Sequence, residues 1–274
     1  MSLTERFDIR GRVALVTGGS GELGSAMAHG LAEVGVRVAV MGRRSAACER
    51  VAAAIRAAGG EAIGVAGDVM RRDEVERAVA QVVATLGPID ILVNGAGGNQ
   101  PGATTGTEQP FFAIDGATFS AVVDSNLMGA VTCSQVVGKL MAERQQGTII
   151  NIASMSGIRP LTRVVAYSAA KAALANFTQW LAVHLAQEYS PAIRVNAIAP
   201  GFFLTEQNRF LLTEQATGDW TARGQTIIAH TPQGRFGAGD DLIGALLWLA
   251  SPAAAFVTGI VVPIDGGFSA FGGV

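Results

Sequence analysis

The stretch that decides the fold is Val13-Ala-Leu-Val-Thr17, followed at once by Gly18-Gly-Ser-Gly-Glu-Leu-Gly24. An apolar run without alternation predicts a strand buried on both faces. The glycines at 19, 21 and 24 fit G-x-G-x-x-G, and residues 25–34 continue with helical spacing. A strand, a glycine-rich turn and a helix in this order place backbone N–H groups and a helix N-terminus where they can face a pyrophosphate. An ordinary tight turn is the alternative.

Five further runs rich in valine and isoleucine follow, and Ala-rich segments with helical spacing separate them. The segments 46–57 and 73–86 are clear examples of such helices. The alternation predicts an α/β fold, a Rossmann-like, doubly wound parallel sheet with helices on both faces. The five runs are Val36–Val40, Ile89–Val93, Thr148–Ile152, Ile193–Ala197 and Ile260–Ile264.

No Pro/Ser-rich linker or change of composition divides the 274 residues, so we interpret residues 1–274 as a single domain. The alternation is interrupted at 202–236, where mixed polar and aromatic residues extend further than a connecting loop requires. We interpret this segment as a lid or substrate loop over the site.

Composition and charge exclude several classes of protein. Hydrophobic residues make up 49% of the chain, which suits strands covered on both faces. A net charge of -2 with no run of Lys or Arg argues against a nucleic-acid partner. Cys48, Cys133 and three scattered histidines lack disulfide or metal-ligand spacing, so we expect no metal. The polar N-terminus and the interrupted apolar stretches predict no signal peptide and no membrane partner, and hence a cytoplasmic protein.

The tip of the second predicted strand bears on the choice of dinucleotide. A free ribose 2′-hydroxyl is usually bound by an Asp or Glu there, and here the tip reads Val40-Met-Gly-Arg-Arg44. Arg43 and Arg44 can instead pair with a 2′-phosphate through forked, charged hydrogen bonds. We therefore favour NADP(H) and leave NAD(H) open, since a solvated pair of arginines at a helix entry would look the same.

Tyr167 and Lys171 are a candidate catalytic pair. They stand four residues apart in a helical pattern and so share one helix face. A phenol pKa near 10 must fall by about three units, or about 4 kcal/mol, to serve as acid and base near neutrality. A unit charge at ~4 Å supplies about that amount at an effective dielectric of ~20, so we expect Lys171 to lower the pKa of Tyr167. A packed ring beside an amine that reaches solvent is the alternative.

Ser154 lies just beyond the predicted strand Thr148–Ile152, at the end of a parallel sheet where ligands bind. A hydroxyl there can hydrogen-bond a substrate oxygen and orient it against the phenol. A serine that closes a strand-to-loop turn is the alternative.

These residues occur in the order found in the short-chain dehydrogenase/reductase family, which the chain resembles over nearly its whole length. Ser154 and Tyr167 are thirteen positions apart, as in that family. The resemblance implies an NAD(P)-dependent oxidoreductase with Tyr167 as general acid/base and Lys171 as its pKa modulator and ribose ligand. It also implies that Ser154 orients the substrate and that Asn126 holds a proton-relay water. The matching positions are Thr17-Gly18 with Gly24, Asn94-Gly-Ala-Gly97, Asn126, Ser154, Tyr167, Lys171 and Pro200-Gly201.

The same resemblance implies where the dinucleotide binds, from the adenine at Asp68 and Val69 to the nicotinamide side at Pro200–Thr205. Glu22 departs from the family, which usually has Gly or Ala there, and a carboxylate beside a diphosphate repels it unless it turns to solvent. The expected cofactor residues are Gly18, Gly19, Ser20, Gly21, Leu23, Gly24, Arg43, Arg44, Asp68, Val69, Asn94, Gly95, Ala96, Gly97, Tyr167, Lys171, Pro200, Gly201, Phe203 and Thr205.

Four longer stretches, at 99–105, 177–184, 200–210 and 230–236, resemble the D-mannonate oxidoreductase (fructuronate reductase) branch of the family. This resemblance implies interconversion of D-fructuronate and D-mannonate, a sugar-acid substrate whose carboxylate needs a cation. Arg159, our first candidate, and Arg163 lie between Ser154 and Tyr167, and a guanidinium can grip a carboxylate with two parallel bonds. Further candidates, for which exposed loop residues are the alternative, are Gln100, Gln207, Asn208 and Arg209.

Other functions use the same residues. A reductase of another polyol, of a ketogluconate or of a 3-oxoacyl thioester would carry the same catalytic set. A nucleotide-sensing binding protein would need no Ser154, Tyr167 and Lys171 together. Apolar helices near 119–144 and 166–189 predict a symmetric oligomer, and the resemblance implies a homotetramer. We expect Cys133, Trp180 and His184 to serve in an interface or the core.

Overall fold

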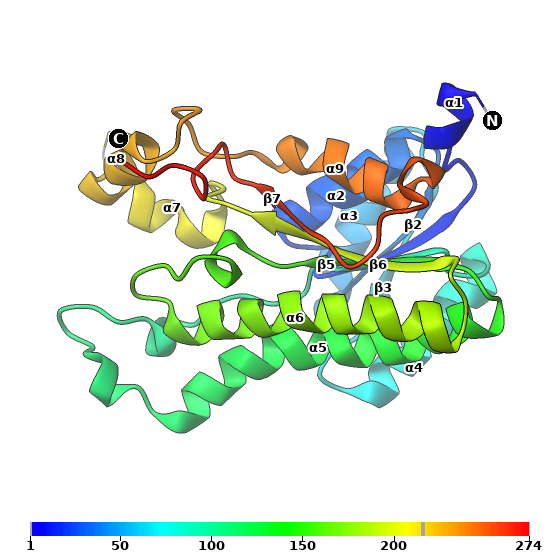
Figure 1. Ribbon diagram of the computed structural model, residues 1–274, viewed down its shortest axis with the longest axis horizontal. Helices are drawn as coiled ribbons and strands as arrows, with labels where there is room; N and C mark the ends of the chain where they lie inside the picture. Colours follow the sequence, from blue (N-terminus) through cyan, green and yellow to red (C-terminus); the bar gives the residue numbers. More distant parts are fainter. Residues whose placement is uncertain (1, 215–216, 274) are drawn as a thin grey trace.

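The computed structural model describes residues 2–214 and 217–273, without the side chains of residues 206, 207 and 210. Seven strands form one sheet in the order β3-β2-β1-β4-β5-β6-β7, and all neighbours are parallel (Figure 1). The predicted Rossmann-like fold is confirmed. The strands are β1 (Val13–Thr17), β2 (Arg37–Gly42), β3 (Ala62–Ala66), β4 (Ile91–Asn94), β5 (Gly147–Ile152), β6 (Ile193–Pro200) and β7 (Val261–Ile264).

Helices cover both faces of this sheet. Because successive strand residues point to opposite faces, Ala14 and Val16 pack against α2, α3 and α9, whereas Val13 and Leu15 pack with α4, α5 and α6. Both sets are fully buried, which explains why the sequence of β1 is an unbroken apolar run. In Figure 1, α5 and α6 lie side by side beneath the sheet. The helices are α2 (Glu22–Glu33), α3 (Ser45–Ala57), α4 (Arg72–Leu86), α5 (Gly116–Glu143), α6 (Val165–Glu188) and α9 (Ile243–Ala250).

The order of the strands reverses at β1. The chain builds outward from β1 to β2 and β3, and then returns to place β4 on the other side of β1. Such a reversal opens a crevice at the carboxyl ends of the two central strands, where open α/β sheets bind ligands. Thr17 ends β1, Asn94 ends β4, and the two residues are neighbours in register. The glycine-rich turn and the residues after β4 therefore meet at this point.

The sequence analysis did not identify β3 as a strand. It lies at the edge of the sheet, pairs with β2 alone, and has only two fully buried residues, Ala62 and Val65. Gly64 stands at its centre because a Cβ there would lie 2.6 Å from the backbone nitrogen of Glu49. With two alanines, a central glycine and only one valine and one isoleucine, β3 lacks the enrichment in valine and isoleucine that marks the other strands.

The segment 202–236 contains two helices, α7 (Glu206–Leu212) and α8 (Ala222–Ala229). They lie together at one end of the molecule, beside the C-terminal tail (Figure 1). Leu212, Ile227 and Phe236 form a small buried cluster apart from the two main cores, and the ring of Trp220 lies 4.9 Å from that of Phe236. The segment 202–236, which interrupts the α/β alternation, thus forms a packed helical layer with its own small core.

The remaining elements are short. The chain begins with α1 (Leu3–Phe7), and the loops carry the single-turn helices η1 (Pro101–Ala103), η2 (Phe111–Ala113), η3 (Met155–Gly157), η4 (Gly239–Leu242) and η5 (Pro252–Ala254). Within the described ranges, no helix combines the length and the apolar character needed to cross a bilayer. The same ranges hold no group of His, Cys, Asp or Glu side chains that could bind a metal ion.

Candidate active site

The glycine-rich turn is fastened to the end of β4. Thr17 Oγ1 accepts a hydrogen bond from the Gly95 N–H at 3.1 Å. Gly18 has φ +66°, and a Cβ there would lie 2.7 Å from the Gly95 carbonyl oxygen. A Cβ on Gly24 would collide with the Gly18 oxygen, whereas a Cβ on Gly21 would stay 3.4 Å from that atom. The fold therefore requires glycine at positions 18 and 24 but not at position 21.

The turn has the form of an anion cradle. Gly21 precedes α2 and no side chain caps the first turn of that helix, so its N-terminal amides are available to a phosphate. Position 19 also requires glycine, because a Cβ there would lie 2.8 Å from the Val16 oxygen. Leu23 packs against the core, and Glu22 is exposed in the first helical turn, where the dipole favours a carboxylate. A glycine cradle below an uncapped helix at the switch point fits a dinucleotide phosphate.

The residues expected around the adenosine lie on the same side of the sheet. Arg43 and Arg44 are exposed at the end of β2, and neither forms an ion pair with any described residue. The Asp68 carboxylate accepts a hydrogen bond at 3.0 Å from the backbone N–H two residues on, so it holds its own turn. Val69 packs on α5, where a Cβ at Gly129 would approach it to 2.6 Å. Of these four residues, Arg43 and Arg44 therefore carry the positive charge that could bind a 2′-phosphate.

The side chains of Ser20 and Asn94 form hydrogen bonds within the protein. Ser20 hydrogen-bonds the thiol of Cys48, whose pKa burial raises. The Asn94 amide donates to Ser134 Oγ at 3.1 Å and to Asn151 Oδ1 at 2.8 Å. Asn94 thus points into the protein, and from this stretch only Gly95, Ala96 and Gly97 can offer backbone atoms to a ligand.

Ser154, Tyr167 and Lys171 converge at the carboxyl end of β5. Lys171 is 4% exposed, its Nζ donates to the Ile152 carbonyl at 2.7 Å, and this nitrogen lies 5.5 Å from the centroid of the Tyr167 ring. Ser154 is buried two residues beyond Ile152, and its Oγ accepts hydrogen bonds from the Ser156 N–H at 3.2 Å and the Ser156 hydroxyl at 3.1 Å. The three predicted side chains therefore meet around one point.

The pKa of Tyr167 is raised above its ordinary value, because burial disfavours the phenolate more than a hydrogen bond with Ser154 favours it. Burial also lowers the pKa of Lys171 to about 8. We expected Lys171 to lower the phenol pKa, and that expectation is wrong for this structure. The burial that brings the pair together penalises both charges, and the ammonium lies over the ring, bound to a backbone carbonyl. At neutral pH the phenol is protonated, the form that can donate a proton.

Asn126 fastens the loop after β4 to α5. Its Nδ2 donates to the Gly98 oxygen at 2.7 Å and to the Val122 oxygen at 2.8 Å, and its Oδ1 accepts from the Gly98 N–H at 3.1 Å. A Cβ on Gly97 would come within 2.5 Å of the same Oδ1. The side chain is therefore used for positioning, and the relay water expected near Asn126 stays a prediction.

The residues expected on the nicotinamide side form the base of the 202–236 segment. Gly201, which follows Pro200, packs on Asp265, to whose Cβ a Cβ at 201 would approach within 2.5 Å. Phe203 is 4% exposed. Asn208 accepts from the Thr205 N–H at 2.8 Å and donates to the Phe203 carbonyl at 2.7 Å. Asn208, a candidate for the substrate, thus holds the start of α7.

A cavity of about 610 Å³ lies between the loop 159–163 and α8. Arg159 and Arg163 line it, as expected of substrate residues, and the loop that carries them joins Ser154 to Tyr167. Gln100 and Arg209 are exposed and do not line this cavity. The side chain of Gln207 lies outside the described residues. Of the six substrate candidates selected from the sequence, the structure therefore brings together Arg159 and Arg163.

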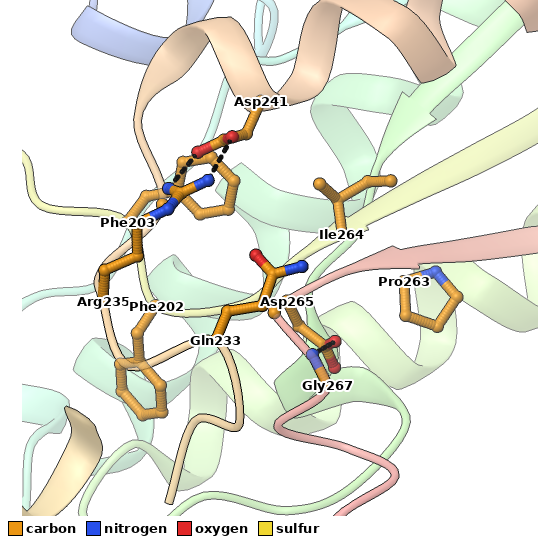
Figure 2. A pocket seen from close by; sticks show the side chains of 11 residues that line it. Phe202, Phe203, Gln233, Arg235, Asp241, Pro263, Ile264, Asp265 and Gly267 are labelled. Atoms are coloured by element: carbon orange, nitrogen blue, oxygen red, sulfur yellow. Dashed lines mark hydrogen bonds and ion pairs between the residues drawn. The ribbon is translucent and has the colours of Figure 1, made fainter. Parts of the chain in front are cut away.

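Figure 2 shows a second cavity, of about 360 Å³, at the ends of β6 and β7. Arg235 and Asp241 face each other there in a two-pronged ion pair of 2.6 and 2.7 Å. Asp265 accepts a hydrogen bond from the Gly267 N–H at 3.0 Å. The charged groups of this cavity are thus paired within the protein.

The sequence analysis missed Arg223, His230 and Phe268, which also line the larger cavity. Arg223 and Arg209 occur in similar polar surroundings, so local sequence does not distinguish them. Arg223 can be assigned to the cavity only from the fold, in which α8 and the loop 159–163 line the same space.

Comparisons with known proteins agree with this geometry. A family model described as short chain dehydrogenase matches residues 12–216. A protein of Bacillus subtilis (strain 168) named as the uncharacterized oxidoreductase UxuB is 49% identical over 276 residues, covering 97% of this chain and 98% of its own. The crystal structure of a proposed D-mannonate oxidoreductase from Haemophilus influenza with bound NAD gives a TM-score of 0.92 at 39% identity, covering 100% of both chains. A gluconate 5-dehydrogenase from Burkholderia cenocepacia J2315 in complex with NADP and tartrate gives 0.87 at 32% identity, covering 98% of this chain and 100% of its own.

Proposed function

Because the chain belongs to the short-chain dehydrogenase family, we propose that it interconverts the ketone of a keto-sugar acid and a secondary alcohol, with D-fructuronate and D-mannonate as the substrate pair. The chain is an NAD(P)-dependent oxidoreductase that acts on CH–OH groups. The observation that carries the sugar-acid proposal is the cavity lined by Arg159 and Arg163, on the loop that joins Ser154 to Tyr167. The similarity to a proposed D-mannonate oxidoreductase and to a gluconate 5-dehydrogenase supports it.

A reduced nicotinamide, when bound, supplies the hydride, so the protein must supply a proton. Tyr167 is protonated at neutral pH and donates to the ketone oxygen, so that the phenol O–H bond breaks as the alcohol O–H bond forms. Ser154 hydrogen-bonds the same oxygen and fixes its orientation. Solvent then returns a proton to the phenolate, and Lys171, whose Nζ is fixed at the Ile152 carbonyl, would bind the ribose of the dinucleotide.

The preferred dinucleotide in this proposal is NADP(H), with NAD(H) accepted. Arg43 and Arg44 support it, because they are exposed at the tip of β2 without an ion pair to any described residue. The gluconate 5-dehydrogenase relative holds NADP, but the proposed D-mannonate oxidoreductase holds NAD. Replacing both arginines by serine should weaken NADPH binding and spare NADH. A higher kcat/KM for NADH in the unaltered enzyme would overturn the preference.

A substrate panel tests the reaction itself. D-fructuronate, 5-keto-D-gluconate and a 3-oxoacyl thioester are each offered with NADPH and with NADH, and nicotinamide absorbance is followed. We expect the highest kcat/KM for D-fructuronate. 5-Keto-D-gluconate is the second candidate, because the same arginine-lined cavity suits any keto-sugar acid. Preference for the thioester would overturn the sugar-acid proposal.

The assembly and the lid belong to the same proposal. We take residues 1–274 as one cytoplasmic domain in which the segment 202–236 covers the site, since Phe202 and α8 line the larger cavity. A homotetramer is supported by the outer face of α6, where Trp180 is 57% exposed and stacks on His184 at 4.8 Å. Sedimentation at about four times the chain mass is expected. Cys133 of α5 is fully buried in the core cluster that α5 shares with α4 and α6, so we take its role to be core packing.

A further inference from the structure

The larger cavity has more positive charge than the two predicted arginines provide. Besides Arg159 and Arg163, it is lined by Arg223 of α8 and by His230, the residue that follows this helix. Among the described residues that line it, none is an aspartate or a glutamate. Cations contributed from two segments, with no acid between them, create a positive potential that attracts an anion.

One wall of the cavity is held in a strained conformation. Arg163 has φ +76°, in the left-handed region that costs a residue other than glycine about 1 kcal/mol or more. The Arg163 carbonyl accepts a hydrogen bond from the Thr105 N–H at 2.8 Å, which helps to fix this conformation. Such strain persists only where surrounding structure imposes it, and it is common at ligand-binding positions.

The opposite wall is also fixed by packing. Gly224, next to Arg223, is buried, and a Cβ there would lie 2.5 Å from the Leu212 oxygen. Thr221 caps α8 by accepting the Gly224 N–H at 3.1 Å, and Ile227 anchors the helix in the cluster of the 202–236 segment. Arg223 is therefore carried by a packed helix.

The two walls place like charges close to each other. The pKa of Arg223 is lowered, first by burial and then by the positive charge of Arg163. Neither arginine forms an ion pair within the part of the chain that the structure describes. An anion between them would remove this repulsion and gain charged hydrogen bonds from both sides.

We propose that Arg223 is a specificity-determining residue that binds the carboxylate of the substrate together with Arg159 and Arg163, and so selects sugar acids over neutral sugars. The inference rests on the proposed function, because it assigns a further residue to the same site. A planar guanidinium presents two parallel donors to a carboxylate, which an ammonium cannot do.

The experiment compares Arg223→Met, Arg223→Lys and the control Arg6→Met, a change at an exposed arginine of α1 outside the cavity. D-mannonate and its neutral counterpart D-mannitol are titrated calorimetrically, and their oxidation is then measured. Loss of one charged hydrogen-bonding group should weaken D-mannonate binding and raise its KM by about 10- to 100-fold. The KM for D-mannitol should change by less than about threefold, Arg223→Lys should recover part of the loss, and Arg6→Met should match the unaltered enzyme.

Folding is checked by the melting temperature. Because Arg223→Met removes a repulsion with Arg163, its melting temperature should not fall, so weaker binding cannot be ascribed to unfolding. An equal effect on D-mannonate and D-mannitol would overturn the role of Arg223, as would an unchanged affinity for D-mannonate. If D-mannonate binds in an Arg223-dependent way without being oxidised, the proposed function fails and the role of Arg223 in binding anions stands. If D-mannonate does not bind at all, both fail.

Discussion

The catalytic residues and the candidate substrate arginines lie on one stretch of chain but in opposite environments. Ser154 and Lys171 are buried, and each makes a hydrogen bond with the protein backbone. Arg159 and Arg163 stand between them in sequence, are exposed, and form no ion pair with a described residue. The groups that we propose move the proton are therefore fixed by the fold, whereas the groups that would recognise the substrate stay unpaired until an anion arrives.

This contrast separates two kinds of kinetic effect. A change among the buried catalytic residues should lower kcat for every substrate, because each ketone needs the same proton. A change among the exposed arginines should raise KM for acids alone, because a neutral sugar offers them no charge. The effects of single substitutions on kcat and KM test this division.

The largest expected effect is that of Tyr167→Phe. Loss of a general acid typically costs about 10²- to 10⁴-fold, so kcat should fall by that factor for D-fructuronate and 5-keto-D-gluconate alike. Dinucleotide binding, measured by fluorescence, should persist. Tyr189→Phe alters the second of the two tyrosines, which is exposed, and serves as the control. Retained turnover in Tyr167→Phe would remove the phenol from the reaction.

Next in size is Arg159→Met. We expect KM for D-fructuronate to rise by about 10- to 100-fold, the loss of one charged hydrogen-bonding group, while KM for NADPH stays constant. Arg6→Met is again the control. A fall in kcat without a change in KM would break the division, because it would place Arg159 with the catalytic residues.

A smaller effect separates two glycines of the cradle. Gly24→Ala forces a Cβ against the Gly18 oxygen and should lower the free energy of unfolding by about 1–3 kcal/mol. Gly21→Ala meets only ordinary contact at 3.4 Å and should leave stability nearly unchanged. Urea unfolding of the dinucleotide-free proteins measures both. Equal losses would show that the fold requires both glycines.

The positions of the candidate catalytic residues and most of the sheet could be predicted from sequence because their signals are local. Six of the seven strands give runs rich in valine and isoleucine, and the helical spacing of Tyr167 and Lys171 places them on one face. The strand β3 escaped because it is half-exposed, with Gly64 at its centre. The glycine motif could be found in the sequence. Which of its positions require glycine could not be predicted, because only the folded turn shows where a Cβ would collide.

Long-range packing and burial could not be predicted in the same way. Arg223 joins the cavity only through the position of α8, which no local pattern gives. The pKa of Tyr167 moves opposite to the expected direction because the desolvation of a side chain depends on everything packed around it. Asn94 and Asn208 looked available for ligands, yet the structure uses both to hold the chain.

The smallest expected effect has the opposite sign and concerns Lys171. Below pH 8 this amine is charged in both the folded and the unfolded chain, so folding bears the full cost of burying the charge. A pKa lowered from 10.5 to about 8 corresponds to a cost of about 3 kcal/mol, from which the lost hydrogen bond to Ile152 subtracts about 1 kcal/mol. Lys171→Met should therefore be inactive yet more stable at pH 7, by about 2 kcal/mol. As the pH rises from 8 toward 10.5 the folded protein already holds a neutral amine, so the advantage of the variant should shrink, and then reverse to about 1 kcal/mol in favour of the unaltered protein, which keeps the hydrogen bond to Ile152. Melting curves across this range test the argument, with Lys139→Met as the control, and an advantage of the variant that grows with pH would contradict it.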